Sequence, residues 1–328
     1  MRRVPGTLTA HADSGPSVVA LGGGHGLAAT LKSLRRLTDQ ITAVVGVADD
    51  GGSSGRLRRE FGILPPGDLR MALAALCGDD TWGRTWQRVI QHRFSGAGEL
   101  GGHSLGNLLI TALWEETADP VAGLAWLGML LEAQGRVLPC SLQPLEIVAQ
   151  VRGVHPFSPD VITEVRGQVE IATTPGEVVS IAIEPSRPQA CPEAIQAVQG
   201  ADAIILGPGS WFTSVLPHLL IPELCRAIVE ADARRLLVMN LAPDDDIETA
   251  GIPVARHLEF LRAVAPAIRL DGVIADPRHV DDVDRLAQAC EGLGAELHLA
   301  QLAYEHGRQP GVHDPDRLAV ALRTAVNG

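Results

Sequence analysis

The residues best suited to chemistry in this 328-residue sequence are glycines, hydroxyls and carboxylates that directly follow short apolar runs. The first group follows residues 18–21 and consists of Gly22, Gly23, Gly24, His25 and Gly26. Glycine accepts positive φ and lets an anion approach the backbone amides without a Cβ in the way. Leu27, Leu31 and Leu34 recur at helical spacing, so a helix should begin near Gly26 and point its free N–H groups at the anion. The turn therefore predicts a phosphate-binding loop.

The spacing of this turn leaves its ligand open. Residues 24–29, GHGLAA, match the GxGxxA form of a dinucleotide fingerprint, which would favour NAD. Counted from the end of the apolar run, however, the loop lacks the usual third glycine, and no Lys-Ser/Thr pair follows to make it a Walker A loop. A tight turn with a purely structural role is the alternative.

A second turn follows the apolar residues 41–48, which are typical of a buried strand. It contains Asp49, Asp50, Gly51, Gly52, Ser53 and Ser54. The adjacent carboxylates have three interpretations: they orient ribose hydroxyls, hold a divalent cation such as Mg²⁺, or cap the next helix, for which either serine is also a good N-cap by type. Capping accounts for one aspartate and one serine, but not for so many hydrogen-bonding residues beside the first turn.

Further polar side chains stand at expected helix starts. Asp68 follows Pro65-Pro66-Gly67, where an N-cap belongs, and Arg70, one turn inside that helix, is able to reach a phosphate. His103 and Asn107 open another helix over residues 108–116. Asparagine is a poor choice there for helix stability, so a satisfied buried amide and a ligand-facing amide are equally good interpretations of Asn107.

A third junction of this kind follows the apolar residues 203–206. It contains Gly207, Pro208, Gly209 and Ser210, with Thr213 and Ser214 close behind. A later strand, residues 235–239, ends at Asn240. Because ligands of open α/β sheets bind beyond the carboxyl ends of the strands, the glycine turns predict two sides of one crevice.

The elements that must position these turns alternate between strand and helix along much of the chain. This order predicts an α/β fold, Rossmann-like, with a largely parallel sheet in three layers. Residues 66–135 have helical patterns throughout and predict an inserted helical cap, whereas residues 137–184 form a β-rich segment. We expect a single domain over residues 18–328, preceded by a flexible N-terminal arm over residues 1–17.

Composition argues against several classes of function. The formal net charge of −12 disfavours a nucleic-acid partner, which would need a basic face. No run reaches the roughly 18 apolar residues of a membrane span. Five scattered cysteines, with no pair at metal-ligand spacing, are typical of reduced thiols in a cytoplasmic protein.

Five longer motifs are similar to the YvcK family, the so-called gluconeogenesis factors, within the CofD superfamily. They are GGGHGL, VADDGGSSGRLR, GILPPGDLRMAL, GGHSLGNLL and ILGPGSWFTSVLPHLL. The resemblance extends from Val18 to about Leu261 and implies a Rossmann-like core and a UDP-sugar ligand, chiefly UDP-N-acetylglucosamine. It also implies a cytoplasmic regulator that links carbon metabolism to cell-wall synthesis and cell shape, without an established reaction. The sequence departs from the family pattern at His25, where threonine is usual, and at Ile252, where tyrosine is usual.

The CofD branch of the superfamily implies a different function, the Mg²⁺-dependent transfer of a phospholactyl group from a guanosine-diphosphate donor. In that case the catalytic residues would be Asp49, Asp50, Arg56 and Arg70, with the two aspartates as metal ligands. An NAD-dependent dehydrogenase is a third interpretation and rests on GxGxxA alone. We therefore expect a UDP-sugar-binding regulator, with the transferase as the alternative, and leave open a homodimer and a regulatory protein partner.

Overall fold

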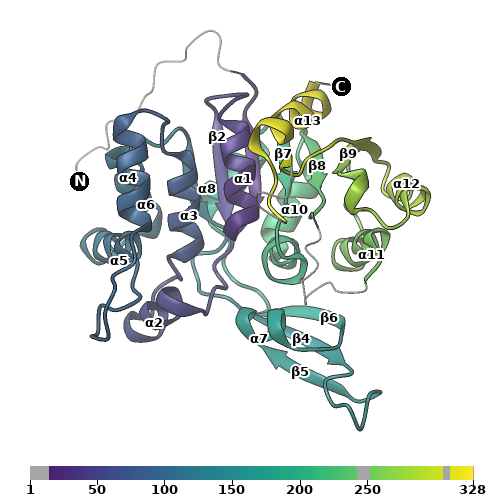
Figure 1. The fold of residues 1–328 in the computed structure, drawn as a ribbon, viewed down its shortest axis with the longest axis horizontal. Helices are drawn as coiled ribbons and strands as arrows, with labels where there is room; N and C mark the ends of the chain where they lie inside the picture. Colours follow the sequence, from purple (N-terminus) through teal and green to yellow (C-terminus); the bar gives the residue numbers. More distant parts are fainter. Residues whose placement is uncertain (1–14, 242–251, 306–310, 328) are drawn as a thin grey trace.

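The computed structural model describes residues 15–241, 252–305 and 311–327 (Figure 1). Residues 1–14 of the predicted N-terminal arm lie outside this part of the chain, so the arm stays a prediction. All five cysteines lie inside it as free thiols.

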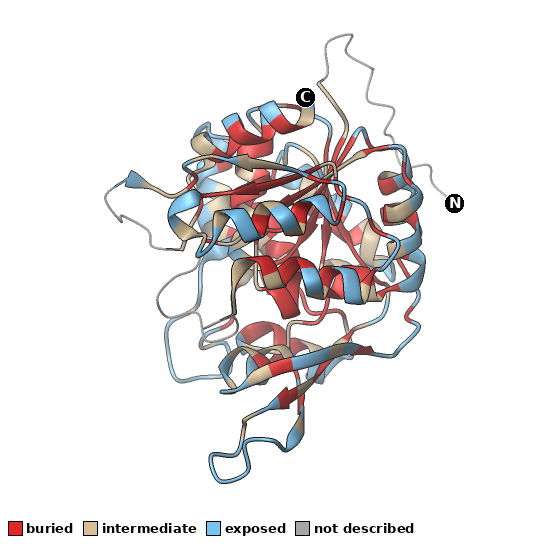
Figure 2. Cartoon of the chain, turned by 90° about the vertical axis from the view of Figure 1, so that its right-hand side faces the viewer, coloured by how far each residue is buried: buried red, intermediate tan, exposed pale blue. Residues whose placement is uncertain are grey.

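Seven parallel strands form the main sheet, in the order β10-β9-β8-β7-β1-β2-β3. Their bounds are β1 Val18–Gly22, β2 Ile41–Val45, β3 Arg136–Pro139, β7 Ala203–Leu206, β8 Arg234–Val238, β9 Gly272–Ala275 and β10 Glu296–Leu299. Every residue of β1 and β7 is buried, as expected for near-continuous apolar strands covered on both faces. Figure 2 shows the buried residues concentrated in this sheet and exposed residues on the outer sides of the helices.

Helices cover both faces of the sheet. On one face α1 (Gly24–Leu34) packs between α3 (Gly67–Leu76) and α13 (Pro315–Asn327), and on the other α8 (Pro192–Gln199) packs against α10 (Pro222–Glu230) (Figure 1). This arrangement confirms the predicted Rossmann-like α/β fold. The remaining helices are α2 Gly52–Phe61, α4 Thr81–Gln91, α5 Leu105–Thr117, α6 Pro120–Leu130, α7 Gln168–Thr173, the π-helix η1 Trp211–Val215, α9 Pro217–Leu220, α11 Val254–Val264, the 3₁₀-helix η2 Pro277–His279 and α12 Val283–Glu291.

The residues between β2 and β3 are helical, as predicted, and comprise α2 to α6. One of these helices, α3, packs on α1 and against β2 and β3, so it belongs to the helix layer of the sheet. The β-rich segment is also present. It is a separate antiparallel sheet in the order β5-β4-β6, formed by β4 Glu146–Arg152, β5 Ile162–Arg166 and β6 Glu177–Glu184. This small sheet lies beyond the end of the main sheet at which α1 begins (Figure 1).

Among the described residues, no single helix is long and apolar enough to cross a membrane. One bent pair, Trp211–Leu220 with Pro222–Glu230, reaches the necessary length and composition only when both helices are counted together.

Candidate nucleotide-binding crevice

The strand order places a topological switch point between β1 and β7. The two strands are neighbours, but β1 is followed by β2 on one side and β7 by β8 on the other. Right-handed connections then place α1 and α10 on opposite faces, and in open α/β sheets such a point marks a ligand-binding crevice beyond the carboxyl ends of the two strands, here β1 and β7. The first and third glycine turns of the sequence border this crevice.

These two turns touch each other through Gly26, near the start of α1. A Cβ on Gly26 would lie 2.2 Å from the carbonyl oxygen of Pro208 and 2.9 Å from Cα of Gly209. The Thr30 hydroxyl also donates to the carbonyl of Gly207, at 3.2 Å. Thr30 was not predictable from the sequence, because a threonine one turn inside a helix has no local feature that points to a distant partner. The contact fixes the start of α1 against the turn after β7.

The turn after β7 is held to β8 by Asn240. The Gly209 N–H donates to Asn240 Oδ1, and Asn240 Nδ2 donates to the Gly209 carbonyl, each at 2.7 Å. Gly209 has φ +151°, which favours glycine at this position. The hydroxyls of Ser210 and Thr213 hydrogen-bond to each other at the start of η1. Asn240 therefore shapes the crevice from a third strand.

A carboxylate occupies the start of α1, where the sequence suggested an anion. Asp68 accepts a hydrogen bond from the Gly24 N–H, and its Oδ2 lies 2.5 Å from where a Cβ on Gly23 would be. The predicted N-cap role of Asp68 is wrong, because the N-cap of α3 is Pro66. Burial, and then the charge of Asp49, raise the pKa of Asp68 to about 7, although the hydrogen bond from Gly24 and the charge of Arg70 favour the charged form. Asp68 thus titrates close to neutral pH.

The adjacent aspartates of the second turn have different partners. Asp49 Oδ1 accepts from the Gly51 N–H at 3.0 Å, and its Oδ2 would lie 2.6 Å from a Cβ on Gly67, so it faces the start of α3. Asp50 Oδ1 accepts from the backbone N–H of Val169, at the start of α7, at 3.1 Å. Asp49 therefore borders the crevice beside Asp68, while Asp50 fixes the small sheet.

Neither of the two serines after this turn is the N-cap of α2, although both residue types are suited to that role. The N-cap of α2 is Gly51, and both serines are buried inside the helix. Ser53 Oγ lies 3.0 Å from His103 Nδ1 and accepts from Asn107 Nδ2 at 3.0 Å. Ser54 Oγ accepts from the Gly67 N–H at 2.7 Å. The serines join α2 to the starts of α3 and α5.

Burial lowers the pKa of His103, and the charge of Arg56 lowers it further. The imidazole is therefore neutral at pH 7, and its Nδ1 partner, Ser53, fixes the orientation of the ring. Arg56 donates to the carbonyl of Gly101 at 2.8 Å, which ties the loop before α5 to α2.

Arg70 is the most unusual side chain of the crevice. It is 4% exposed, and within the described residues none of its nitrogens forms a hydrogen bond or an ion pair. Its aliphatic part packs on α5, where a Cβ on Gly106 would lie 2.7 Å from Arg70 Cγ. Burial lowers its pKa, and the charge of Arg93 lowers it further, whereas Asp68 and Asp49 raise it. A buried guanidinium without partners is costly unless an anion binds it.

Asn107 Oδ1 is a second buried atom without a partner, in a residue that is 1% exposed. Two other predicted positions are open: Gly24 has φ +58° and Gly52 has φ +43°, and a Cβ on either would meet no atom within 4 Å. His25 is exposed beside Gly24. A Cβ at either glycine would enter open space, and Gly24 is partly and Gly52 largely exposed.

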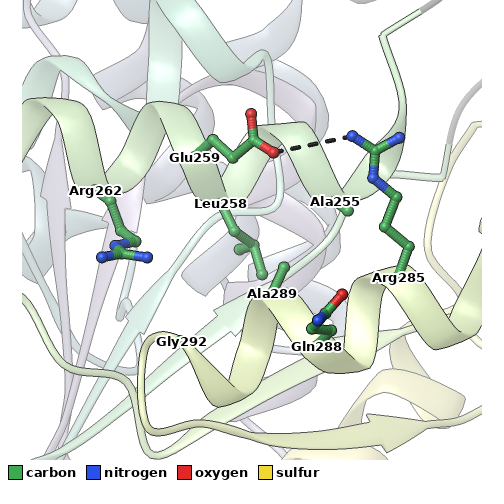
Figure 3. A pocket seen from close by; sticks show the side chains of 8 residues that line it. All are labelled: Ala255, Leu258, Glu259, Arg262, Arg285, Gln288, Ala289 and Gly292. Carbon is green, nitrogen blue, oxygen red and sulfur yellow. Dashed lines mark ion pairs between the residues drawn. The ribbon is translucent and has the colours of Figure 1, made fainter.

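One surface pocket lies elsewhere, between α11 and α12 (Figure 3). Glu259 and Arg285 face each other across it at 4.0 Å. It contains none of the residues predicted from the sequence. Within the described residues, no group of three or more His, Cys, Asp or Glu side chains is arranged to hold a metal ion.

A family model, curated relatives and solved structures all relate this chain to one group of proteins. The model of the family described as 2-phospho-L-lactate transferase CofD matches residues 18–300. A Mycobacterium leprae protein, provisionally named gluconeogenesis factor, is 49% identical over 314 residues, which cover 94% of this chain and 86% of the relative. A gluconeogenesis factor of Halalkalibacterium halodurans is 34% identical over 275 residues, covering 84% and 82%. The crystal structure of a UPF0052 family protein from Bacillus halodurans superimposes with a TM-score of 0.82 at 30% identity, covering 93% of this chain and 98% of that one.

Proposed function

This chain belongs to the CofD family and, within it, to the gluconeogenesis factors, and we propose that it is a regulatory protein that binds a UDP-sugar, chiefly UDP-N-acetylglucosamine. It would act in the cytoplasm and link carbon metabolism to cell-wall synthesis and cell shape. Binding without turnover is the expected behaviour of such a sensor.

The observation that carries this proposal is the unpaired, buried guanidinium of Arg70. Arginine is well suited to phosphate because its donors form a planar fork that is always charged. A diphosphate in the crevice would supply the missing acceptors and would remove the cost of burying the charge. The accessible backbone at Gly52 supports the same assignment, since phosphates are often bound by glycine turns at helix starts. The space beside Gly24 is also open, and there the N–H already donates to Asp68, so a phosphate would displace or join that carboxyl group.

The uncharged parts of the ligand need hydrogen-bond donors and acceptors. Asn107 Oδ1 has no donor within the described residues, and its amide group is fixed by the bond from Nδ2 to Ser53. A fixed acceptor of this kind would select a ligand N–H or O–H group, such as those of a sugar or a pyrimidine. Asp49, which lies near Asp68, would accept from ribose hydroxyls.

The family match also favours a second candidate, a CofD-type transferase that uses Mg²⁺ and a nucleoside-diphosphate donor. Mg²⁺ is usually bound by one or two carboxylates together with substrate phosphates, and it neutralises phosphate charge. Asp49 and Asp68 fit this role better than Asp49 and Asp50, because Asp50 is turned to α7. Arg56 and Arg70 remain candidates to stabilise charge on the donor.

Calorimetric titration with UDP-N-acetylglucosamine, UDP-glucose, GDP and NAD, each with and without Mg²⁺, would separate these functions. The proposal expects the UDP-sugars to bind without Mg²⁺ and without release of products. The Arg70→Gln variant should bind them about 10- to 100-fold more weakly, the loss of one to two charge-assisted hydrogen bonds. Arg226→Gln on the exposed surface of α10 is the matched control and should bind like the unmodified protein.

Three results would contradict the regulator. GDP binding that requires Mg²⁺, followed by consumption of a donor, would support the transferase. Preferential NAD binding would support the dinucleotide interpretation of GxGxxA. Equal UDP-sugar affinity in the Arg70→Gln variant and the control would show that Arg70 does not bind the diphosphate, and the proposal would lose its main support.

A further inference from the structure

A chain of buried hydrogen bonds joins the start of α5 to the start of α2. Asn107 Nδ2 donates to Ser53 Oγ at 3.0 Å, and Ser53 Oγ lies 3.0 Å from His103 Nδ1. Asn107 is 1% exposed, Ser53 3% and His103 7%. A serine beside a histidine is also the arrangement of a nucleophile and its base, so the positions of the protons decide what this chain of bonds can do.

The hydrogen bonds of Ser53 argue against a nucleophile. A hydroxyl group has two lone pairs and one proton. The lone pairs of Ser53 Oγ accept from Asn107 Nδ2 and, at 3.4 Å, from the backbone N–H of Ser104. Only the proton remains for the bond to His103, so Ser53 donates to Nδ1. Because both lone pairs are engaged and the residue is buried, Ser53 has none left to attack a ligand.

The same bonds fix the proton on the imidazole of His103. Burial, and then the charge of Arg56, lower the pKa of this ring against the smaller opposite effect of Glu60, so the ring is neutral at pH 7. A neutral imidazole carries one proton, and Nδ1 is the acceptor for Ser53, so the proton is on Nε2. Within the described residues Nε2 has no partner, and it is not completely enclosed. Nε2 is therefore a donor that a ligand can reach.

Two other groups of the candidate site belong to the helices that these hydrogen bonds join. Gly52, the first residue of α2, has open space where a Cβ would be. Gly106, in the first turn of α5, packs on the aliphatic part of Arg70, whose guanidinium has no partner within the described residues. His103 directly precedes α5 and lies in the same cluster of helix starts. Its free donor is therefore placed to act together with Arg70.

We propose that His103 is a specificity-determining residue of this site, which donates from Nε2 to a carbonyl oxygen of the bound nucleotide sugar. Ser53 and Asn107 are positioning residues that keep the proton on that nitrogen. The inference rests on the proposed UDP-sugar ligand. A neutral donor suits a neutral carbonyl acceptor, because no charge is then buried without a partner, whereas the charged Arg70 suits the diphosphate. The carbonyl belongs either to the base or to an N-acetyl group on the sugar.

Two substitutions of His103 separate its outward nitrogen from the one that binds Ser53. The amide nitrogen of glutamine lies at about the distance of Nε2 from the backbone, and that of asparagine at about the distance of Nδ1. His103→Asn should therefore bind UDP-N-acetylglucosamine about 3- to 10-fold more weakly than His103→Gln, the loss of one hydrogen bond. A purely structural role would give the opposite order, because only asparagine keeps the contact with Ser53. His155→Asn, in the exposed loop before β5, is the control and should bind like the unmodified protein.

Titration of both variants with UDP, UDP-glucose and UDP-N-acetylglucosamine locates the acceptor. A weaker affinity of His103→Asn for all three would assign the base carbonyl, and a difference with UDP-N-acetylglucosamine alone would assign the N-acetyl carbonyl. Equal affinities of the two variants for every nucleotide would overturn the inference. So would a difference with both sugars but not with UDP, or one shared by inorganic pyrophosphate. Failure of the unmodified protein to bind any UDP-sugar would instead count against the proposed function itself.

NMR of the protein labelled with ¹⁵N-histidine tests the proton position without any ligand. At pH 7.5 the ring of His103 should be protonated at Nε2 and not at Nδ1, and His103→Gln would assign its signals. Asn107→Asp should reverse this, because a carboxylate does not donate: Ser53 would turn its proton toward the carboxylate, and Nδ1 would then carry a proton. Protonation at Nδ1 in the unmodified protein, or covalent labelling of Ser53 by a fluorophosphonate, would overturn the arrangement.

Discussion

Asp68 and Arg70 lie two residues apart in α3 and carry opposite charges when both are ionised. Burial raises the pKa of the carboxyl and lowers that of the guanidinium, and each charge favours the other without a direct ion pair. An anion that enters the crevice would stabilise the charge on Arg70 and destabilise the charge on Asp68. Anion binding should therefore be coupled to protonation of Asp68.

This coupling predicts proton uptake when a UDP-sugar binds in the absence of Mg²⁺. The pKa of Asp68 is about 7, so part of the population is ionised at pH 7.5 and gains a proton as the diphosphate arrives. Calorimetry in buffers of different ionisation enthalpy would measure the uptake. The Asp68→Asn variant has no proton to gain and should show none. Proton release by the unmodified protein would contradict the coupling.

Asp68 should also make stability depend on pH. Its pKa in the folded protein, about 7, is higher than its ordinary value of 3.8, so between these values the folded state keeps a proton that the unfolded state loses. The free energy of unfolding should then fall as the pH rises from about 4 to 7, by at most about 4 kcal/mol for a shift of this size. Urea denaturation at pH 5 and pH 8 checks this, since Asp68→Asn should reduce the difference between the two. An unchanged difference would assign the pH dependence to other groups.

At the residue scale, the sequence indicated which polar residues belong to the site but not which residues they contact. Asp49, Asp50, Ser53 and Ser54 were all selected from one turn, but type and spacing do not fix the direction of a side chain in an irregular loop. Asp50 reaches Val169, 119 residues away, and the serines bind residues of α3 and α5. The missing partner of Arg70 was not predictable either, because a sequence does not show which donors stay unsatisfied.

At the scale of elements, the glycine turns were recognisable because each follows a fully buried strand. The lengths of the strands were less predictable. The apolar residues 41–48 suggested one strand, but β2 ends at Val45, while Val47 and Ala48 are buried without continuing the strand. Apolar patterns report burial, whereas a strand ends where its ladder of hydrogen bonds ends. The order of the strands, which creates the switch point, depends on pairings between distant segments that local patterns do not encode.

The contact between α1 and the turn after β7 leads to a prediction for Gly26. In the Gly26→Ala variant the new Cβ would stand 2.2 Å from a backbone oxygen of Pro208, so the helix and the turn must separate. We expect a loss of about 1–3 kcal/mol in the free energy of unfolding, the range for overpacking, together with weaker ligand binding. Denaturation and calorimetry would measure the two effects.

The matched control for Gly26 is Gly128→Ala in α6. A Cβ on Gly128 would meet only Leu73 Cδ2, at an ordinary 3.8 Å, so this variant should be neutral or more stable by up to about 1 kcal/mol. Equal stability of the two variants would mean that the turn after β7 yields easily, and that it does not need the contact with α1 to keep its shape.

At the scale of the whole molecule, the small sheet meets the main body around the crevice. Asp50 binds the start of α7, Arg58 donates to the Leu145 carbonyl at 2.8 Å, and Arg256 of α11 pairs with Glu177 of β6 at 2.7 Å. The β-rich composition of this segment was visible in the sequence. Its position was not, because it depends on a few contacts between residues far apart along the chain. These contacts connect the second glycine turn, α2 and α11 to the segment that contains the small sheet.

Because Asp49 and Asp50 have different partners, their replacement should have different effects. Loss of Asp50 should affect mainly the small sheet, and loss of Asp49 mainly ligand binding. Asp50→Ala removes the acceptor for Val169 and should loosen the small sheet, which hydrogen exchange would detect as faster exchange in residues 146–184 with an unchanged main sheet. UDP-sugar affinity should fall less than in Asp49→Ala, since Asp49 faces Asp68 and the crevice. Asp160→Ala, in the exposed loop before β5, is the control for non-specific loosening. If Asp50→Ala abolished binding while exchange in the small sheet stayed slow, Asp50 would be a ligand-binding residue, and its bond to α7 would be secondary.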